Sequence, residues 1–257
     1  MSDRSGVAKF SKWMTAGATT RLLAAVAFMA AAQVAAQPVT TRDPAPKTVD
    51  EFRGQVARLK TLVYDPSAQF SASVIVAQLR DLAAFATKQS NDTAERRDVY
   101  LMIGNIEKKA GKDQDSMDAY KRGLSMVVSP PLPGHRAAVD NWQFAELLSD
   151  AKDFTTSAKH YRLATQHAAG VATITEDQRL GIRQQLGYVL HEAKRYAEAL
   201  EVNLPLLAEG ERLHGSDSDN LRGLITNIAQ NLHALGRKAE ADPYLQRAIV
   251  LARGSGK

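Results

Sequence analysis

A set of small residues recurs along the chain with a period close to 42 residues. Hydrophobic segments end in a small residue at Gly104, Ala145, Gly187 and Ala229, with spacings of 41, 42 and 42 residues. Two further positions keep the register, twelve and sixteen residues later: Ser116, Ser157, Ala199 and Ala241, then Tyr120, Tyr161, Asn203 and Leu245. A fixed period of about 20–50 residues indicates a repeat architecture, in which each unit buries its apolar face against the next one.

Each repeat is predicted to contain two helices that cross at the small residues. Close helix crossings need a small side chain at the contact, and the large residue beside it fills the neighbouring groove. Aromatic residues make up only 6% of the chain, and alternating β-branched runs are hard to find after residue 90. The sequence therefore predicts an all-α fold.

The pattern resembles the tetratricopeptide repeat (TPR), a helix–turn–helix unit usually of about 34 residues, in the longer variety found in kinesin light chains. The last unit matches best: it has Gly236 for a left-handed turn and Pro243 for the first turn of the next helix. The second unit has Lys152 in place of the turn glycine. The resemblance implies an α-solenoid over residues 93–257, with repeats at about 93–133, 134–175, 176–217 and 218–253.

Residues 50–92 contain two amphipathic stretches that predict an N-terminal helical pair, which could form a degenerate leading repeat. Between the first two repeats, Pro130, Pro131 and Pro133 predict a long loop, because proline is excluded from helix interiors.

Residues 1–36 have the order of a cleavable N-terminal signal peptide: basic residues, an apolar run after Arg21, and the small-residue site Val34-Ala35-Ala36. Cleavage is expected before Gln37 or, alternatively, before Gln33. The apolar run is shorter than the about 20 residues that span a bilayer, so membrane association is expected at most through an uncleaved signal. We expect a bacterial protein that is periplasmic or secreted; the true start could be Met1 or Met14.

Residues 37–49 follow as a flexible linker, since Pro38, Pro44 and Pro46 lie among small polar residues. The absence of cysteine excludes disulfides and thiolate chemistry. The net charge is +5, of which +3 falls within the first 36 residues, so the remainder lacks the clustered charge of a nucleic-acid binder.

The sequence contains no complete catalytic or cofactor-binding motif. The chain has no glycine-rich nucleotide fingerprint, and its six histidines form no tight ligand pair, so we expect neither a cofactor nor a metal. Ser149-Asp-Ala-Lys152 and Ser218-Asp219-Asn220 superficially match β-lactamase motifs, but no Lys-Thr-Gly follows and no sheet is predicted. The protein is therefore not predicted to be an enzyme.

An amide side chain precedes the large-small pair in three predicted first helices, at Gln143, Gln185 and Asn227. Related kinesin-light-chain-like repeats carry asparagines there, and the resemblance implies that they face a concave groove and bind a partner's backbone, for which an amide offers both donor and acceptor. The alternative is that these amides reflect only the ancestry of the repeat. The full predicted partner-binding set is Asn105, Trp142, Gln143, Glu146, Gln185, Tyr188, His191, Asn227, Gln230 and His233.

Two functions compete. The first is a protein–protein interaction scaffold that holds a partner protein or peptide in the groove, within the bacterial envelope. The second is an accessory subunit of an exported enzyme system, with activity at an interface. The first agrees better with the missing catalytic motifs.

Overall fold

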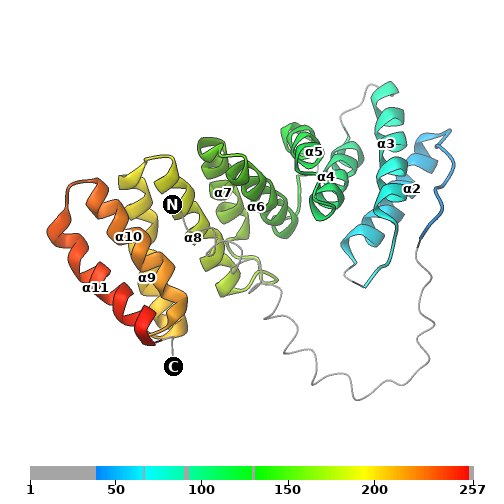
Figure 1. The fold of residues 1–257 in the computed structure, drawn as a ribbon. Helices are drawn as coiled ribbons and strands as arrows, with labels where there is room; N and C mark the ends of the chain where they lie inside the picture. Colours follow the sequence, from blue (N-terminus) through cyan, green and yellow to red (C-terminus); the bar gives the residue numbers. More distant parts are fainter. Residues whose placement is uncertain (1–38, 66, 90–92, 129–130, 255–257) are drawn as a thin grey trace, which may run out of the picture. The chain divides into compact units, whose positions relative to one another are not determined.

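The structure is a computed structural model that describes residues 39–65, 67–89, 93–128 and 131–254. The predicted signal peptide lies outside the described residues. The described residues form α-helices joined by short connections, with one isolated β-bridge between Val39 and Phe70 (Figure 1). In chain order the helices are α2 (Val49–Tyr64), α3 (Ala72–Lys88), α4 (Ala94–Lys109), α5 (Asp113–Ser125), α6 (Gly134–Asp150), α7 (Phe154–Ala168), α8 (Glu176–Glu192), α9 (Tyr196–His214), the 3₁₀ helix η2 (Asp219–Leu221), α10 (Arg222–Ala234) and α11 (Lys238–Gly254).

The helices pack chiefly against their neighbours in sequence (Figure 1). The pairs α4/α5, α6/α7, α8/α9 and α10/α11 are the four predicted repeats, and α2/α3 precede them. Buried apolar residues form four successive clusters, which span α2–α5, α4–α6, α6–α9 and α8–α11. Each unit thus shares its core with the next one, as expected of a helical solenoid.

The small residues that set the register lie where the two helices of a unit cross. Ser116 Oγ donates to the Gly104 carbonyl at 2.7 Å, and Ser157 Oγ donates to the Ala145 carbonyl at 2.7 Å, so two successive units make the same bond. Ser116, Ser157 and Ala199 are 0% exposed and Ala241 is 1% exposed. The predicted helix crossings are confirmed.

The turn inside each repeat has one conformation, whatever its sequence. Gly111, Lys152, Lys194 and Gly236 all have a left-handed backbone, with φ of 72°, 62°, 59° and 76°. In every unit the next residue donates its N–H to the carbonyl five residues back, for example Asp153 to Leu148 at 2.8 Å and Arg237 to Leu232 at 2.9 Å. This is the Schellman arrangement that closes helix C-termini.

The position expected for Pro243 was wrong. Helix α11 already begins at Lys238, so Pro243 lies inside the helix rather than in its first turn. Its missing N–H therefore removes one helical hydrogen bond. The loop between α5 and α6, where three prolines lie, joins Ser125 to Gly134.

The described part of the predicted linker, residues 39–48, makes contacts with α2 and α3. Val39 donates its N–H to the Gln69 carbonyl at 3.1 Å, Asp43 accepts from Gln78 Nε2 at 2.8 Å, and Pro44 accepts from Gln55 Nε2 at 3.0 Å. Thr48 then caps α2 by accepting from the Glu51 N–H at 3.1 Å. These bonds tie the segment to the leading helix pair.

Candidate functional site

The ten predicted partner-binding residues all lie on the first helices of the four repeats, and we call the surface that they define the first-helix face. Asn105 on α4 is buried at 5% exposure, whereas the residues on α6 and α8 are half-buried. On α10, Asn227 is half-buried while Gln230 and His233 are exposed. Accessibility of the predicted face therefore increases from α4 to α10.

Two of the three predicted groove amides have their oxygens engaged inside the stack. Gln143 Oε1 accepts from the hydroxyl of Tyr120, and Asn227 Oδ1 accepts from Asn203 Nδ2 at 2.6 Å. Tyr120 and Asn203 occupy the same register position in the second helix of the preceding repeat. These amides therefore join consecutive units, and part of their hydrogen-bonding capacity is already used inside the stack.

Gln185 differs from the other two amides. Its side chain is half-buried and forms no hydrogen bond within the described residues, so both its donor and its acceptor are available. The residue equivalent to Tyr120 and Asn203 is Tyr161, which is buried at 1% exposure against the α6–α9 cluster. Gln185 is consequently the amide best placed to bind a partner.

A buried amide network links the last two repeats. Asn231 Nδ2 donates to Asn227 Oδ1 at 2.8 Å, and Asn231 Oδ1 lies 2.8 Å from His191 Nδ1. Asn231 is 0% exposed and Asn203 is 1% exposed. Their NH₂ groups are satisfied by Asn227, whereas Asn203 Oδ1 has no hydrogen-bond partner among the described residues. Because the Asn231 oxygen faces the ring, His191 Nδ1 is the donor and its Nε2 is the acceptor in the neutral imidazole.

Carboxylates from α6 and α8 gather around Tyr188. Burial and the nearby Glu146 raise the pKa of Asp150, while Lys108 opposes the rise. Burial, Glu192 and Asp150 in turn raise the pKa of Tyr188. Lys108 forms an ion pair with Glu146, which leaves Asp150 and Glu192 to give this part of the first-helix face a negative character.

Trp142 and Asn105, both predicted to bind a partner, are held within the stack. Trp142 packs at the edge of the α6–α9 cluster, and within the described residues its Nε1 has no hydrogen-bond partner. Asn105 lies in a stretch of α4 in which every residue from Arg97 to Glu107 is buried. These two residues contribute to packing in the structure.

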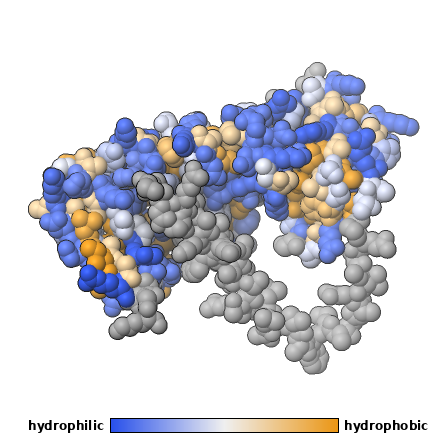
Figure 2. Space-filling model, in the orientation of Figure 1, coloured by the Kyte–Doolittle hydropathy of each residue, from blue (hydrophilic) through white to orange (hydrophobic). Residues whose placement is uncertain are grey.

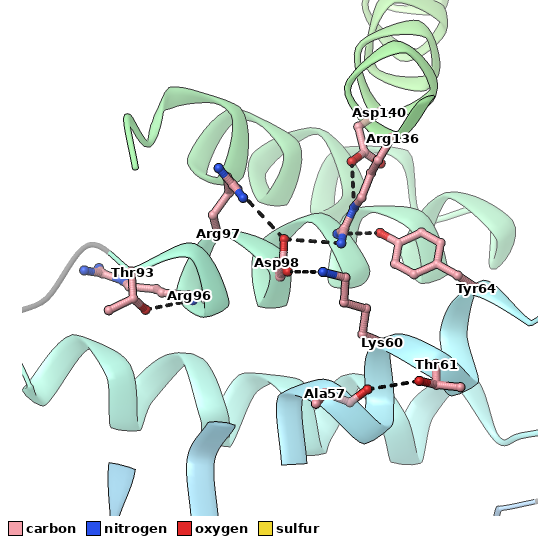
Figure 3. Close-up of polar contacts among 10 residues, drawn as sticks. All are labelled: Ala57, Lys60, Thr61, Tyr64, Thr93, Arg96, Arg97, Asp98, Arg136 and Asp140. Carbon is pink, nitrogen blue, oxygen red and sulfur yellow. Dashed lines mark hydrogen bonds and ion pairs between the residues drawn. The ribbon is translucent and has the colours of Figure 1, made fainter. Parts of the chain in front are cut away.

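A cluster of charged residues, which sequence reasoning missed, joins the first helices α2, α4 and α6 (Figure 3). Asp98 binds Lys60 Nζ at 2.7 Å and Arg136 Nη1 at 3.2 Å, and Arg136 Nε reaches Asp140 at 3.3 Å. Arg136 Nη2 also donates to the Tyr64 hydroxyl at 2.7 Å, and its guanidinium lies over the Tyr64 ring at 4.5 Å. We call Lys60, Tyr64, Arg97, Asp98, Arg136 and Asp140 the polar clamp.

The clamp is largely excluded from water. Asp98 is 6% exposed and Asp140 is 0% exposed. Burial raises the pKa of Asp140 to about 6, against the attraction of Arg136 that lowers it. Burial and the charge of Asp140 raise the pKa of Tyr64 well above its ordinary range, so Tyr64 is a neutral hydroxyl at physiological pH.

Two hollows of the described residues lie away from the first-helix face. One, of about 360 Å³, is bounded by α3 and the turn between α4 and α5, and the other, of about 290 Å³, lies between α7, α8 and α9. Among the described residues, no group of three histidine, aspartate or glutamate side chains is placed to hold a metal. The same residues include no helix long and apolar enough to cross a membrane.

The fold and this open helical face define a class of protein, the stacked helical-repeat proteins. A family model for the tetratricopeptide repeat matches residues 224–254, which are α10 and α11. The match assigns this helix pair to the tetratricopeptide repeat, and the stacked helix pairs before it give the chain a TPR-like repeat fold, as its resemblance to kinesin-light-chain repeats predicted.

Solved structures of similar fold agree with this assignment. The nearly identical TPR-like repeats of a protein described as a Podosopora anserina kinesin light chain match with a TM-score of 0.53 at 12% identity, over 80% of this chain and 96% of theirs. BtubC (BKLC) from P. vanneervenii matches with a TM-score of 0.52 at 14% identity, over 80% and 92% of the two chains. No curated protein matches the sequence. At these identities the similarity establishes the fold alone.

Proposed function

We propose that this protein is an interaction scaffold of the bacterial envelope, which holds an extended segment of a partner protein on the first-helix face of α6, α8 and α10. The observation that carries the proposal is the line of accessible polar and aromatic residues along two adjacent first helices: Gln185, Tyr188, Gln230 and His233. Side chains at equivalent positions of successive repeats recur along an extended surface, as binding to an extended chain requires.

The chemistry of this face favours particular features in the partner. Gln185 offers an amide donor and acceptor that a peptide backbone can use irrespective of its sequence. Tyr188 offers an aromatic ring at low conformational-entropy cost, and such rings often anchor interfaces. Asp150 and Glu192 beside it favour a partner segment that carries lysine or arginine.

Site-specific photocrosslinking in cells tests the proposal. A photoreactive phenylalanine analogue at Tyr188 should capture one protein in stoichiometric amount, because that position lies on the proposed binding face. The matched control is the same analogue at Gln166, an exposed residue of the second helix α7. Equal capture from both positions, or capture from Gln166 alone, would place the binding surface elsewhere.

Affinity for the captured partner then tests the free amides. Gln185→Ala combined with Gln230→Ala should weaken binding about thirtyfold, since the two lost hydrogen bonds are worth about 1 kcal/mol each and every 1.4 kcal/mol is a factor of about ten. Helicity and melting temperature should not change, because neither side chain bonds to another described residue. Asn227 is unsuitable for this test, since its oxygen accepts from Asn203 and Asn231.

The envelope location follows from the predicted signal peptide, and we propose it on that basis. N-terminal sequencing of the protein from cells should find Gln37 or Gln33 at the first position. An intact leader on a membrane-bound product would contradict cleavage, while turnover of a substrate panel by the purified protein would favour the accessory-enzyme alternative.

A further inference from the structure

Helix α11 exposes three large apolar side chains, which we call the apolar stripe. Leu245 and Ile249 lie on the side that earlier second helices turn towards the following repeat, and Val250, equivalent to the exposed Ala208, lies beside that side. Leu245 is 38% exposed, Ile249 is 44% exposed and Val250 is 65% exposed. Figure 2 shows apolar side chains gathered over α11, at the lower left of the view. Apolar residues clustered on one exposed helix face mark an interaction site more often than residues scattered singly.

The internal repeat shows what kind of element fits this stripe. Leu245 and Ile249 are equivalent to Asn203 and Leu207 of α9, which are 1% and 7% exposed. Both are covered there by α10: Asn203 binds Asn227, and Leu207 packs in the cluster that contains the apolar side of α10. The face of α11 therefore has the form that receives another helix, and within the described residues no helix covers it.

The charges along the stripe identify a partner for this face. Asp242 lies at its N-terminal end and Arg253 at its C-terminal end, eleven residues apart, which is close to three full turns of an α-helix, so both are on the same side. Both are exposed, and neither forms an ion pair with another described residue. A helix that runs antiparallel with the same sequence would place an aspartate beside each arginine and apolar residues opposite Leu245 and Ile249.

We infer that the protein self-associates through α11, with the α11 helices of two copies packed antiparallel about a two-fold axis. In this arrangement Asp242 of each copy faces Arg253 of the other, while Leu245, Ile249 and Val250 form the centre of the contact. Such an isologous interface uses the same patch twice and closes at the dimer. The first-helix face of each copy stays free, so this dimer carries two partner-binding surfaces.

The small size of this interface predicts a weak dimer. A contact made by one helix face of about three turns buries less than the roughly 800 Å² per partner of a standard stable interface. Dissociation in the micromolar range, and a monomer–dimer equilibrium that depends on concentration, are the expected behaviour.

Sedimentation analysis of the protein purified in the form that cells produce tests the inference. The native chain should shift from monomer to dimer as its concentration rises to about 0.5 mM. Ile249→Asp should weaken self-association at least tenfold, whereas Leu204→Asp, at a leucine of α9 that is 39% exposed and outside the stripe, should leave it unchanged. A native chain that stays monomeric over this range overturns the inference.

Charge exchange tests the antiparallel geometry. Asp242→Arg alone and Arg253→Asp alone should each abolish dimerisation, because either change puts like charges opposite one another. An equimolar mixture of the two single variants should form heterodimers, and the double exchange within one chain should restore homodimers. Dimerisation of either single variant on its own, or failure of the mixture to associate while both variants keep native helicity, would refute this pairing.

Discussion

The two halves of the repeat array are held together by different chemistry. From α2 to α6, first helices are joined by the polar clamp, in which Asp98 is shared between Lys60 and Arg136. From α8 to α11, the corresponding junction is neutral: a network of amides and a histidine lies beside an apolar cluster. The same repeat register therefore supports an ionic junction at one end and a neutral one at the other.

The difference bears on where a partner can bind. In the clamp half, α4 is buried throughout from Arg97 to Glu107, and this stretch includes the predicted groove residue Asn105. In the neutral half, contacts between units use Asn203, Asn227 and Asn231, and leave Gln185 and Gln230 free. Residues that bridge first helices compete with a ligand for the same surface, so the neutral half is the better candidate for partner binding.

Breaking the clamp should have the largest effect on stability. Asp98→Ala removes the carboxylate that Lys60 and Arg136 share, so the buried Arg136 guanidinium keeps only Asp140 as an acidic partner among the described residues. Removal of one partner from a buried ion pair costs about 3–5 kcal/mol. The loss should appear as a lower free energy of unfolding in urea.

The matched control lies on a half-exposed ion pair in the other half. Glu198 accepts from Arg162 at 2.6 Å and from Arg195 at 2.6 Å, and its side chain is 39% exposed. Because solvent screens that pair, Glu198→Ala should cost less than about 1 kcal/mol. Equal losses for the two variants would show that the clamp has no special role.

The clamp also predicts how stability depends on pH. The pKa of Asp140 in the folded chain, about 6, lies above its ordinary value of 3.8, so the folded state holds this proton more tightly than the unfolded state does. The contribution of Asp140 to the free energy of unfolding is therefore full below about pH 4 and is lost as the pH rises through about 6.

Asp140→Asn should remove this dependence. The difference in free energy of unfolding between the native chain and the variant should change by up to about 3 kcal/mol between pH 4 and pH 7, which follows from about two pKa units. Urea unfolding at several pH values measures it. A constant difference across this range would mean that Asp140 titrates normally.

The clamp shows why sequence reasoning found the fold but missed this site. Small residues at a constant period predicted the helix crossings, because each unit needs a small residue where its own two helices cross. The clamp joins residues far apart in sequence, Lys60 to Asp98 and Tyr64 to Arg136, without a periodic pattern. Its Arg136–Asp140 pair, four residues apart on one helix, could be recognised from the local sequence.

The amides were placed on the correct helices, but their internal bonds were not foreseen. Repeat register located Gln143 and Asn227, and the same register contained the missing signal: Tyr120 and Asn203 precede them by 23 and 24 residues. A contact between a polar residue of one unit and an amide of the next can be recognised only after the stacking of the units is known. The partner role of these residues stays a prediction.

Overpacking at a helix crossing of the neutral half should have the next largest effect on stability. A side chain at Gly187 would overlap the amide of Asn203, which also holds Asn227. Gly187→Leu should therefore destabilise by about 1–3 kcal/mol through overpacking, although leucine is the better helix former.

Gly223 is the matched control for Gly187. It lies in the first turn of α10, and a side chain there would meet only Gln184 Nε2, at 3.4 Å. Gly223→Ala should be neutral or slightly stabilising, as measured by melting temperature. If Gly187→Leu melts at or above the native temperature, the assigned crossing is wrong.

The smallest effect is expected at the turns inside the repeats, where glycine and lysine share one conformation. Lys194 has a φ of 59°, and its side chain is exposed without a partner among the described residues. A left-handed backbone costs an L-residue about 1–2 kcal/mol, part of which glycine returns as conformational entropy in the unfolded chain. Lys194→Gly should therefore raise the free energy of unfolding by about 0.5–1 kcal/mol, and Lys152→Gly should do the same. The reciprocal change Gly236→Lys, at a φ of 76°, should lower it by a similar amount. If the two lysine-to-glycine changes raise the melting temperature and Gly236→Lys lowers it, one turn geometry runs through both halves. A lower melting temperature for Lys194→Gly would mean that the lysine itself stabilises its turn.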